Sequence, residues 1–322
     1  MEMHHVNEES LSLSLIKELE PFFQRNGFLK TYDCLQYLLN NQSCTEEKQL
    51  IVRNNKNLIV GCNLFLKSRA HFLDHEEDIY WSHSTYLEPS YRASCGIKLM
   101  MKVEERENVF GFGLTDINEK LQHLIGNVFL SSSIAYLVQI PSSALNFSAG
   151  KDNCGIPEYF ETAGRTWKRI RRSHELQYPN EGYWNKEKLS VDFVRDEDFI
   201  RRRFLNHYKE YYIYSQVQPK ESVYFIWRYI HYNDSIAVYL VDYRFSIDNP
   251  AQMKGIVDAL VYIASLNHIQ RIFVFSTIGL PQPEYPTSIY GSPSLIVTNH
   301  IMSKDTTVFV TPADSDCELW LE

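Results

Sequence analysis

The stretch Ser84–Glu105, STYLEPSYRASCGIKLMMKVEE, joins the end of a predicted strand to the start of a predicted helix. The strand, Asp78–Leu87, ends at Glu88-Pro89-Ser90, because proline cannot donate to a sheet ladder. Apolar residues at helical spacing follow over Gly96–Glu107. A turn of this kind directs backbone N–H groups and the positive end of a helix dipole at one point, so it can hold a pyrophosphate.

Strict alternation along this strand predicts two faces. The residues expected on one face are Ile79, Trp81, His83, Thr85 and Leu87, and those on the other are Tyr80, Ser82, Ser84 and Tyr86. The turn itself carries Arg92, and Lys98 follows it, so the local charge favours an anion.

The segments around this stretch alternate between helical and strand patterns. Before it, the patterns predict helices at 11–23 and 31–39 and a hairpin of strands at 50–53 and 58–66. After it, they predict strands at 109–114 and 128–140 with a helix ending at 124 between them. The second half adds a helix at 196–207 and then repeats the order hairpin, helix, strand at 223–231, 236–245, 250–267 and 271–276.

This repetition predicts an α/β (α+β) fold of two tandem units, in which helices flank mixed sheets. Residues 141–155 have the composition of a linker. The predicted domains are therefore 1–145, which carries the strand-to-helix turn, and 146–322, which begins with a basic segment.

The composition sets limits on function. The 322 residues carry a formal charge of −8, which opposes binding to nucleic acid or to an anionic membrane. The six cysteines have no metal-ligand spacing, and the first 20 residues lack a signal-peptide pattern, so we expect a cytoplasmic protein without a metal site. Only 13 residues are glycine, so the sequence has few glycines from which a glycine-rich phosphate-binding loop could be built.

Three stretches together resemble the GNAT superfamily of acyl-CoA N-acyltransferases. They are the strand-to-helix turn itself, the upstream LIVGCNLFL at 58–66, and the downstream VFGFGLTDINEKLQHLIGNVF at 109–129. The second half is similar to the divergent second copy of tandem proteins in this superfamily, in FIRRRFLNHYKEYYIY, YFIWRYIHYN, YLVDYRF and TPADSDCELW. The resemblance implies a GNAT fold in each half, with one acyl-CoA site, in the first half.

The resemblance also implies which residues would bind acetyl-CoA or another acyl-CoA. They are Leu87, Arg92, Ala93, Ser94, Cys95, Gly96, Ile97 and Lys98. The family places two small residues in this loop, and here those positions fall on Cys95 and Ile97, or on Gly96 and Lys98 after a shift of one residue. Side chains of Cys95, Ile97 or Lys98 that filled the loop would favour a protein without catalysis. The helix after the fifth strand contains His123 but no tyrosine, the family's usual general acid.

Transfer to an amine needs a proton acceptor near the thioester. The nearest candidates for catalysis are Glu88, His83 and Tyr86, although His83 could instead pack between aromatic rings and Glu88 could be a solvated strand end. Asp314 and Asp316 could bind the amine substrate or lie in an exposed tail.

Other polar clusters have simpler interpretations. His71, His75 and Glu76 have the i, i+4 spacing of a metal site only if the segment is helical, and we expect solvated side chains in a hairpin loop. The basic runs 168–172 and 201–203 could hold a phosphate, but a solvated face is the alternative that we favour.

The sequence thus predicts an N-acetyltransferase that moves an acyl group from an acyl-CoA to a primary amine. An amino sugar of surface-glycan biosynthesis is the preferred acceptor, on the strength of the tandem resemblance. The alternative is a GNAT-shaped binding or scaffold protein without catalysis.

Overall fold

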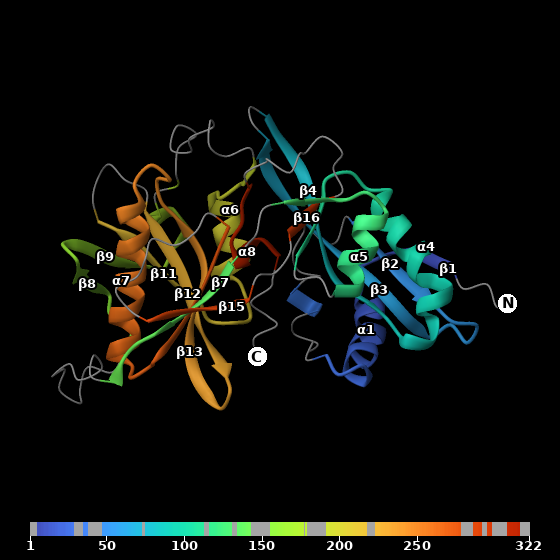
Figure 1. Cartoon of the computed structure of the whole chain (residues 1–322), viewed down its shortest axis with the longest axis horizontal. Helices are drawn as coiled ribbons and strands as arrows, with labels where there is room; N and C mark the ends of the chain where they lie inside the picture. Colours follow the sequence, from blue (N-terminus) through green and yellow to red (C-terminus); the bar gives the residue numbers. More distant parts are fainter. Residues whose placement is uncertain are drawn as a thin grey trace. The chain divides into compact units, whose positions relative to one another are not determined.

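The chain folds into two units, which are described separately (Figure 1). The structure, a computed structural model, describes residues 5–28, 35–37, 47–72, 75–112, 116–130, 134–142, 155–176, 178, 191–217, 223–277, 286–291, 295–297 and 308–315. Unit 1 comprises 1–71, 75–130 and 294–305, and unit 2 comprises 72–74, 131–293 and 306–322. None of the helices in the described ranges has both the length and the apolar character needed to cross a membrane.

Unit 1 is built on one mixed sheet. Its strands lie in the order β1 (His5–Ser10), β2 (Lys48–Arg53), β3 (Ile59–Phe72), β4 (His75–Leu87), β5 (Val109–Phe112), β16 (Leu295–Val297) and β6 (Val128–Leu130). The pair β4–β5 is parallel, because helix α4 (Arg92–Glu104) crosses between the two strands.

Unit 1 contains two further helices, α1 and α5. Helix α1 (Leu13–Arg25) starts at Ser12, whose hydroxyl accepts a hydrogen bond from the backbone N–H of Leu15 at 3.2 Å. The buried face of α1 consists of Leu15, Ile16, Leu19, Phe22 and Phe23, which is the apolar stripe that the sequence shows. Helix α5 (Asp116–Leu124) lies between β5 and β6 in the chain.

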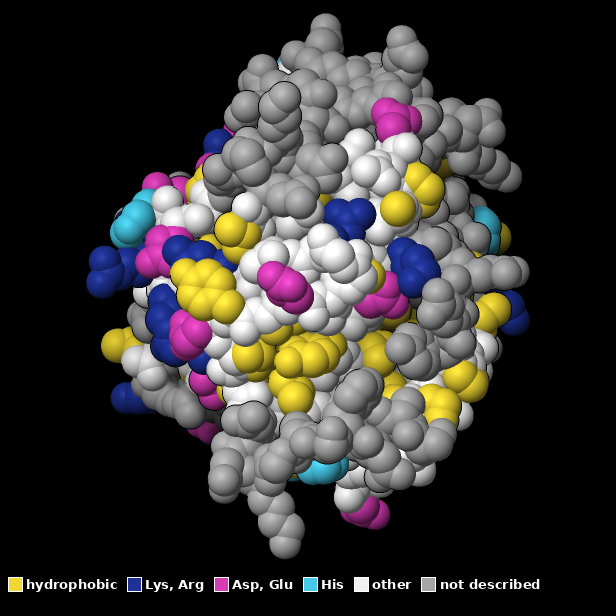
Figure 2. All heavy atoms as spheres, turned by 90° about the vertical axis from the view of Figure 1, so that its left-hand side faces the viewer, with side chains coloured by type: hydrophobic (Ala, Val, Ile, Leu, Met, Phe, Trp, Pro, Cys, Tyr) yellow, Lys and Arg dark blue, Asp and Glu magenta, His cyan; other side chains and the backbone are white. Residues whose placement is uncertain are grey.

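Unit 2 is built on an eight-stranded mixed sheet. The strands lie in the order β15 (Thr287–Gly291), β7 (Ile134–Gln139), β14 (Arg271–Ser276), β13 (Ser235–Arg244), β12 (Tyr224–Tyr232), β11 (Tyr212–Gln216), β9 (Arg165–Ile170) and β8 (Tyr159–Thr162). Helix α7 (Pro250–Leu266) packs on one face, where its buried residues join a core rich in aromatic rings. On the face of this unit that carries α7, β8 and β9, apolar side chains gather in the lower half of the described surface (Figure 2).

The other face of this sheet is covered by short elements. Helix α6 (Glu197–Ile200) begins at Asp196, whose carboxylate accepts from the N–H of Phe199 at 2.7 Å, and continues as a π-helix over Arg201–Leu205. Ile200, Phe204 and Ala313 pack against this face. Further elements in the described residues are the parallel pair β10 (Val191–Phe193) and β17 (Val308–Phe309), two 3₁₀ turns at 89–91 and 173–175, and α8 (Pro312–Ser315).

The two units repeat the same crossover, which confirms the predicted tandem α/β architecture. In unit 1, Tyr80–Ser82 of β4 pair in parallel with β5 after the crossover helix α4. In unit 2, Val238–Leu240 of β13 pair in parallel with β14 after α7. A β-bulge lies between Leu240 and Asp242 of β13, directly beyond the parallel pairing.

The division of the chain differs from the predicted boundary at residue 145. Strand β7 pairs with β14 and belongs to unit 2, so the units separate at Ser131, within the triple-serine break of the sequence. In the opposite direction, β16 returns from the last part of the chain to pair with both β5 and β6. Local patterns cannot show this exchange, because strand partners are chosen by tertiary pairing.

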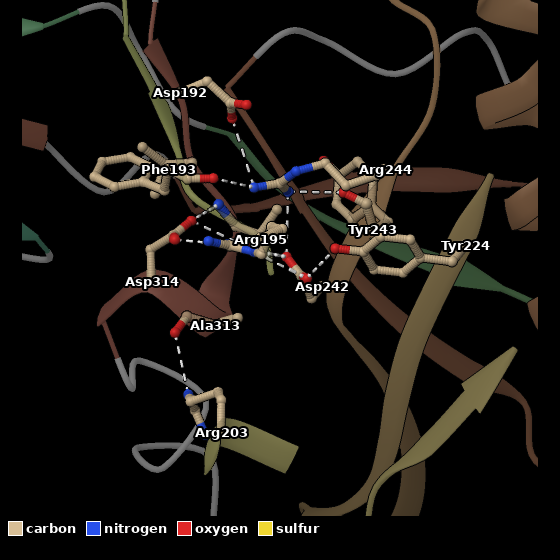
Figure 3. Close-up of polar contacts among 12 residues, drawn as sticks. Asp192, Phe193, Arg195, Arg203, Tyr224, Asp242, Tyr243, Arg244, Ala313 and Asp314 are labelled. Atoms are coloured by element: carbon tan, nitrogen blue, oxygen red, sulfur yellow. Dashed lines mark hydrogen bonds and ion pairs between the residues drawn. The ribbon is translucent and has the colours of Figure 1, made fainter. Parts of the chain in front are cut away.

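Unit 2 contains a buried cluster of charges (Figure 3). Arg195 contacts Asp242 at 3.1 Å and Asp314 at 2.5 Å, and Arg244 contacts Asp242 at 3.2 Å and Asp192 at 3.6 Å. All five residues are at most 6% exposed. The cluster fixes the segment that contains Asp314 against β13, because a buried charge is tolerated only with its partners in place.

Two hydroxyl groups complete the cluster around Asp242. Thr311 Oγ1 donates to Asp242 Oδ1 at 2.6 Å, and the hydroxyl of Tyr224 donates to Oδ2 at 3.0 Å. Burial opposes ionisation of Asp242, but the guanidinium groups of Arg195 and Arg244 outweigh it and hold the pKa of Asp242 below its usual range. This carboxylate is therefore the charged centre of the cluster.

Asp192 has the opposite behaviour. Burial raises the pKa of Asp192 to about 6, although Arg244 and Arg195 partly offset the shift. Its Oδ1 accepts no hydrogen bond among the described residues. The cluster holds three aspartates and two arginines, so a proton on Asp192 balances its charge.

We predict that Asp192→Asn stabilises the protein near neutral pH and not at pH 4. A carboxyl whose pKa is raised on folding lowers the free energy of unfolding as pH rises from about 4 to about 6, and asparagine removes that loss. The gain at pH 7 should reach about 2–3 kcal/mol at most. Urea unfolding of both proteins at pH 4, 5, 6 and 7 measures it. The matched variant Asp242→Asn should destabilise throughout, and a similar loss for Asp192→Asn would contradict the prediction.

Candidate functional site

Strand β4 does not keep its alternation to the end. Ser84 has a φ of 57°, a left-handed backbone conformation that is rare for a residue with a side chain. Tyr80 and Leu87 both pack with the core that contains Cys95 and Leu99 of α4. Strict alternation would put an even and an odd residue on opposite faces, so the irregularity at Ser84 moves the residues after it to the other face. The predicted face assignment is therefore wrong beyond Ser84.

Buried polar contacts confirm this change of face. Ser82 Oγ donates to Asn63 Oδ1 at 2.6 Å, and the hydroxyl of Thr85 donates to the same oxygen. Asn63 is fully buried on β3. Since residues 82 and 85 share one acceptor, they lie on one face, and the network holds the irregular strand in place.

Strand β3 approaches β4 closely at this point. A Cβ on Gly61 would overlap Leu87 Cδ1 and lie 3.1 Å from the carbonyl oxygen of Tyr86. The backbone N–H of Glu88 donates to the carbonyl of Val60 at 2.9 Å. Gly61 is the glycine of the upstream hairpin motif. Glycine is required at this position because a side chain would have no space between β3 and β4.

The described pairing between β4 and β5 is short. It covers Tyr80–Ser82 and Val109–Gly111, and among the described residues β4 has no partner in β5 beyond Ser82. Strand β4 nevertheless continues to Leu87. The edge of His83–Leu87 that faces away from β3 is therefore outside the described sheet ladder.

The chain turns directly from β4 into α4. A single 3₁₀ turn, Pro89–Tyr91, leads into the helix at Arg92, four residues earlier than the pattern predicts. Arg92 Nε donates to the carbonyl of Leu87 at 3.0 Å, and its guanidinium lies 5.8 Å from the ring centre of Tyr86. Arg92, Ala93 and Ser94 are exposed at the helix start, where backbone N–H groups lack partners within the helix.

The overall architecture is similar to solved acyltransferase structures, although no protein-family model and no curated protein matches the sequence. A GCN5-related N-acetyltransferase from Kribbella flavida aligns with a TM-score of 0.59 at 12% identity, covering 91% of this chain and 71% of that one. A GCN5-related N-acetyltransferase from Anabaena variabilis gives 0.55 at 12%, covering 92% and 73%. N-myristoyltransferase of Saccharomyces cerevisiae, with bound myristoyl-CoA, gives 0.61 at 11%, covering 96% and 82%.

The chain has the GNAT fold. The alignments extend over more than nine tenths of its length, so the fold covers both units. This confirms the fold that the loop residues and the tandem order predict.

Within this GNAT fold, some of the predicted CoA-binding side chains are buried in the core and others are exposed to solvent. The side chain of Cys95 is fully buried against Leu87 and Leu99. Ile97 is 62% exposed, and Lys98 also points to solvent. None of these three side chains fills the start of the helix, because Cys95 enters the core and the other two lie one turn further along α4.

Glu88 is held by an ion pair. Arg25 Nε and a terminal guanidinium nitrogen lie 3.0 and 2.9 Å from Glu88 Oε1, and Arg25 also donates to the carbonyl of Ile59. The pair joins the last turn of α1 to the end of β4. The structure thus gives Glu88 a contact that positions the strand end, and sequence reasoning missed Arg25 because the two residues are far apart in the chain.

His83 and Tyr86 lie on either side of the irregular residue. His83 is 9% exposed, and its Nδ1 lies 2.9 Å from Ser84 Oγ. Tyr86 is half-buried and its ring lies 5.9 and 4.8 Å from those of Phe22 and Phe28. Both residues belong to the segment of β4 beyond its pairing with β5.

The predicted acidic substrate site is not an open pocket at Asp314. This residue is 2% exposed and pairs with Arg195 in the buried cluster of unit 2. Its Oδ2 also accepts from the backbone N–H of Thr311 at 2.8 Å. Asp316 lies outside the described residues.

The other polar clusters of the sequence are paired on the surface. His75 contacts Glu77 at 2.7 Å on a strand, and no group of three metal-ligating side chains occurs in the described part of the chain. In the basic runs, Arg171 pairs with Glu158, and Arg202 contacts Asp198 at 2.6 Å. Arg171 and Arg202 thus lie on solvated faces, as the sequence favours, but Arg203 does not: it is 4% exposed and donates to the carbonyl oxygen of Ala313.

We predict that Gly61→Ala destabilises unit 1 by about 1–3 kcal/mol, because the new methyl group must displace Leu87 and the β4 backbone. Gly96→Ala is the matched control: no atom lies within 4 Å of a Cβ there, so alanine in this helix should stabilise by about 0.5–1 kcal/mol. Urea unfolding of the unmodified protein and the two variants measures the predicted loss of stability for Gly61→Ala and the predicted gain for Gly96→Ala. Equal changes in the free energy of unfolding for the two variants would mean that the contact between Gly61 and β4 does not exclude a side chain.

Proposed function

We propose that this protein transfers an acyl group from an acyl-CoA to a primary amine, with the CoA bound at the start of α4 in unit 1. The observation that carries the proposal is the combination of an irregular β4, a short parallel pairing with β5, and a helix that starts immediately after β4. Two solved proteins of similar fold are named N-acetyltransferases, and a third is an N-myristoyltransferase with bound myristoyl-CoA.

The start of α4 offers suitable chemistry for a pyrophosphate. The backbone N–H of Arg92 donates to the carbonyl of Pro89, but the later N–H groups of the first turn and the helix dipole favour an anion. Arg92 adds a guanidinium whose position is fixed by the carbonyl of Leu87, and Lys98, six residues further along α4, adds a second exposed cation. Ala93 and Ser94 are small, so a phosphate can approach the backbone at the helix start. The edge of β4 beyond Ser82, where the described pairing with β5 ends, would bind the extended part of the CoA.

The corresponding place in unit 2 is filled by the chain itself. Beyond the bulge in β13, Asp242 is buried in contact with both Arg195 and Arg244. In the turn before α7, Gln252 Oε1 accepts from the backbone N–H of Ser246 at 2.7 Å. These contacts support a single CoA site, in unit 1.

The transfer itself needs few side chains. The neutral amine attacks the thioester carbonyl, the C–S bond breaks, and the proton lost by the nitrogen is carried to the leaving thiolate of CoA. His83 and Tyr86 are the groups of β4 that we propose for moving this proton. Glu88 is less suited to that role, since its carboxylate is already paired with Arg25. Its contact favours a positioning role at the strand end.

For the acceptor, we propose an amino sugar, which presents a primary amine on a polar ring. This choice rests on the similarity of the tandem sequence pattern to enzymes of glycan pathways. A second candidate function is acyl-CoA binding without catalysis. It is favoured by the ion pair of Glu88 with Arg25 and by Cys95 and Ile97 at positions where the family has small residues.

Calorimetric titration with acetyl-CoA and with myristoyl-CoA tests the site. The unmodified protein should bind one acyl-CoA, and Arg92→Glu should weaken binding about tenfold or more, because it replaces a charge-assisted contact with repulsion. Lys56→Glu changes the net charge equally in the exposed turn between β2 and β3 and should bind normally.

The absence of binding to the unmodified protein, or equal losses in the two variants, would contradict the site. Release of free CoA thiol on addition of glucosamine then separates the enzyme from the binding protein. Binding without thiol release would favour the second candidate.

A further inference from the structure

Two half-buried aromatic rings of unit 1 lie together where helix α1 ends and strand β4 ends. The ring centres of Phe28, which follows α1, and Tyr86, on β4, are 4.8 Å apart, and the rings meet edge to face. Two buried rings support this pair from below. Phe22 lies 5.9 Å from Tyr86, and Phe23 lies 5.9 Å from Phe28. The pair Phe28–Tyr86 therefore has an apolar base and a partly exposed outer side.

The end of α1 fixes the position of Phe28. Gly27 has a φ of 79°, a conformation that favours glycine, and its N–H donates to the carbonyl of Gln24 at 3.1 Å. The N–H of Phe28 donates to the carbonyl of Phe23 at 3.0 Å. These two bonds and the ring contact between Phe23 and Phe28 form a Schellman cap, in which an apolar side chain beyond the helix packs back on its last turns. Local structure thus holds the ring of Phe28 in place without a ligand.

Tyr86 connects this aromatic pair to the proposed site of acyl transfer. The guanidinium of Arg92, at the start of α4, lies 5.8 Å from the ring centre of Tyr86. Leu87 packs towards α4, so Tyr86 faces the opposite side of β4, on which α1 packs. Because the irregularity at Ser84 shifts the alternation by one residue, His83 lies on this same face. The Cα atoms of residues 83 and 86 are at most about 10 Å apart.

We propose that Phe28 and Tyr86 bind a ring of the amine acceptor, so that the acceptor is a ring-bearing primary amine rather than an acyclic one. This inference rests on the proposed function, which places the acyl-CoA at the start of α4. The amine nitrogen lies beside His83, on the face of β4 opposite α4, and the apolar face of the ring packs on the two aromatic rings. An amino sugar and an aromatic amine both have such a face, and the experiment distinguishes them.

Calorimetric titration of the full chain with three primary amines, with and without CoA, tests the need for a ring. Glucosamine and 2-phenylethylamine carry a saturated and an aromatic ring, whereas 2-aminoethanol carries none. We expect one of the ring-bearing amines to bind with one molecule per chain and at least tenfold more tightly than 2-aminoethanol. The tighter of the two identifies the kind of ring.

Variants at Phe28 locate the bound ring. Phe28→Leu keeps an apolar side chain for the helix cap but removes the aromatic face, so it should weaken binding of the tighter amine about fivefold. Phe28→Tyr keeps the aromatic face and should bind that amine as the unmodified protein does. Neither variant should change the affinity for acetyl-CoA. The matched control is Tyr159→Leu, which removes a 61% exposed aromatic ring from β8 of unit 2 and should bind the amine normally.

The outcomes separate this proposal from the proposed function. The ring site is overturned if the three amines bind equally, if none binds, or if Phe28→Leu and Tyr159→Leu have the same effect. Acyl transfer can still stand in those cases, provided that acetyl-CoA binds and thiol is released. Conversely, a ring-bearing amine that binds and depends on Phe28, in a protein that does not bind acetyl-CoA, would support the ring site and contradict acyl transfer.

Discussion

The irregularity at Ser84 is the constraint on which unit 1 depends. One residue with positive φ moves Leu87 onto the face of α4 and Tyr86 onto the face of α1, so both helices can pack against the same strand. The close approach of Gly61 and the buried Asn63 hold the strand in this form. On the other side of β4, the described pairing with β5 ends at Ser82.

Unit 2 contains the same crossover, but buried charged residues lie near the end of its bulged strand. Its bulge in β13 is followed by Asp242 and Arg244, which are neutralised inside the protein rather than by a ligand. The charge cluster fixes the segment around Asp314 to the sheet. In unit 1 the described pairing of β4 with β5 ends at Ser82, whereas in unit 2 buried ion pairs lie beyond the bulge, beside a core of aromatic rings and a largely buried α7.

Much of the fold follows from local patterns. The apolar stripe of α1, the turn at Pro89, and the strand and helix limits around α7 are all set by neighbours in the chain, and they agree with the structure within a few residues. The candidate site was only partly accessible in this way. Arg92 and Ser94 are found by the loop pattern, but Arg25 contacts Glu88 across 63 positions, and no periodicity connects such residues.

The sequence by itself determined the repeated order of hairpin, helix and strand and the position of the turn between β4 and α4, because each depends on residues within one turn or one strand. It did not predict strands such as β9, whose basic residues it assigned to a solvated face. Only the tertiary structure decided the face of each residue beyond Ser84, the burial of Asp314 and Cys95, and the exchange of β7 and β16 between the units. These features depend on contacts between distant segments. Their energies are set by burial and charge pairing, which no local pattern records.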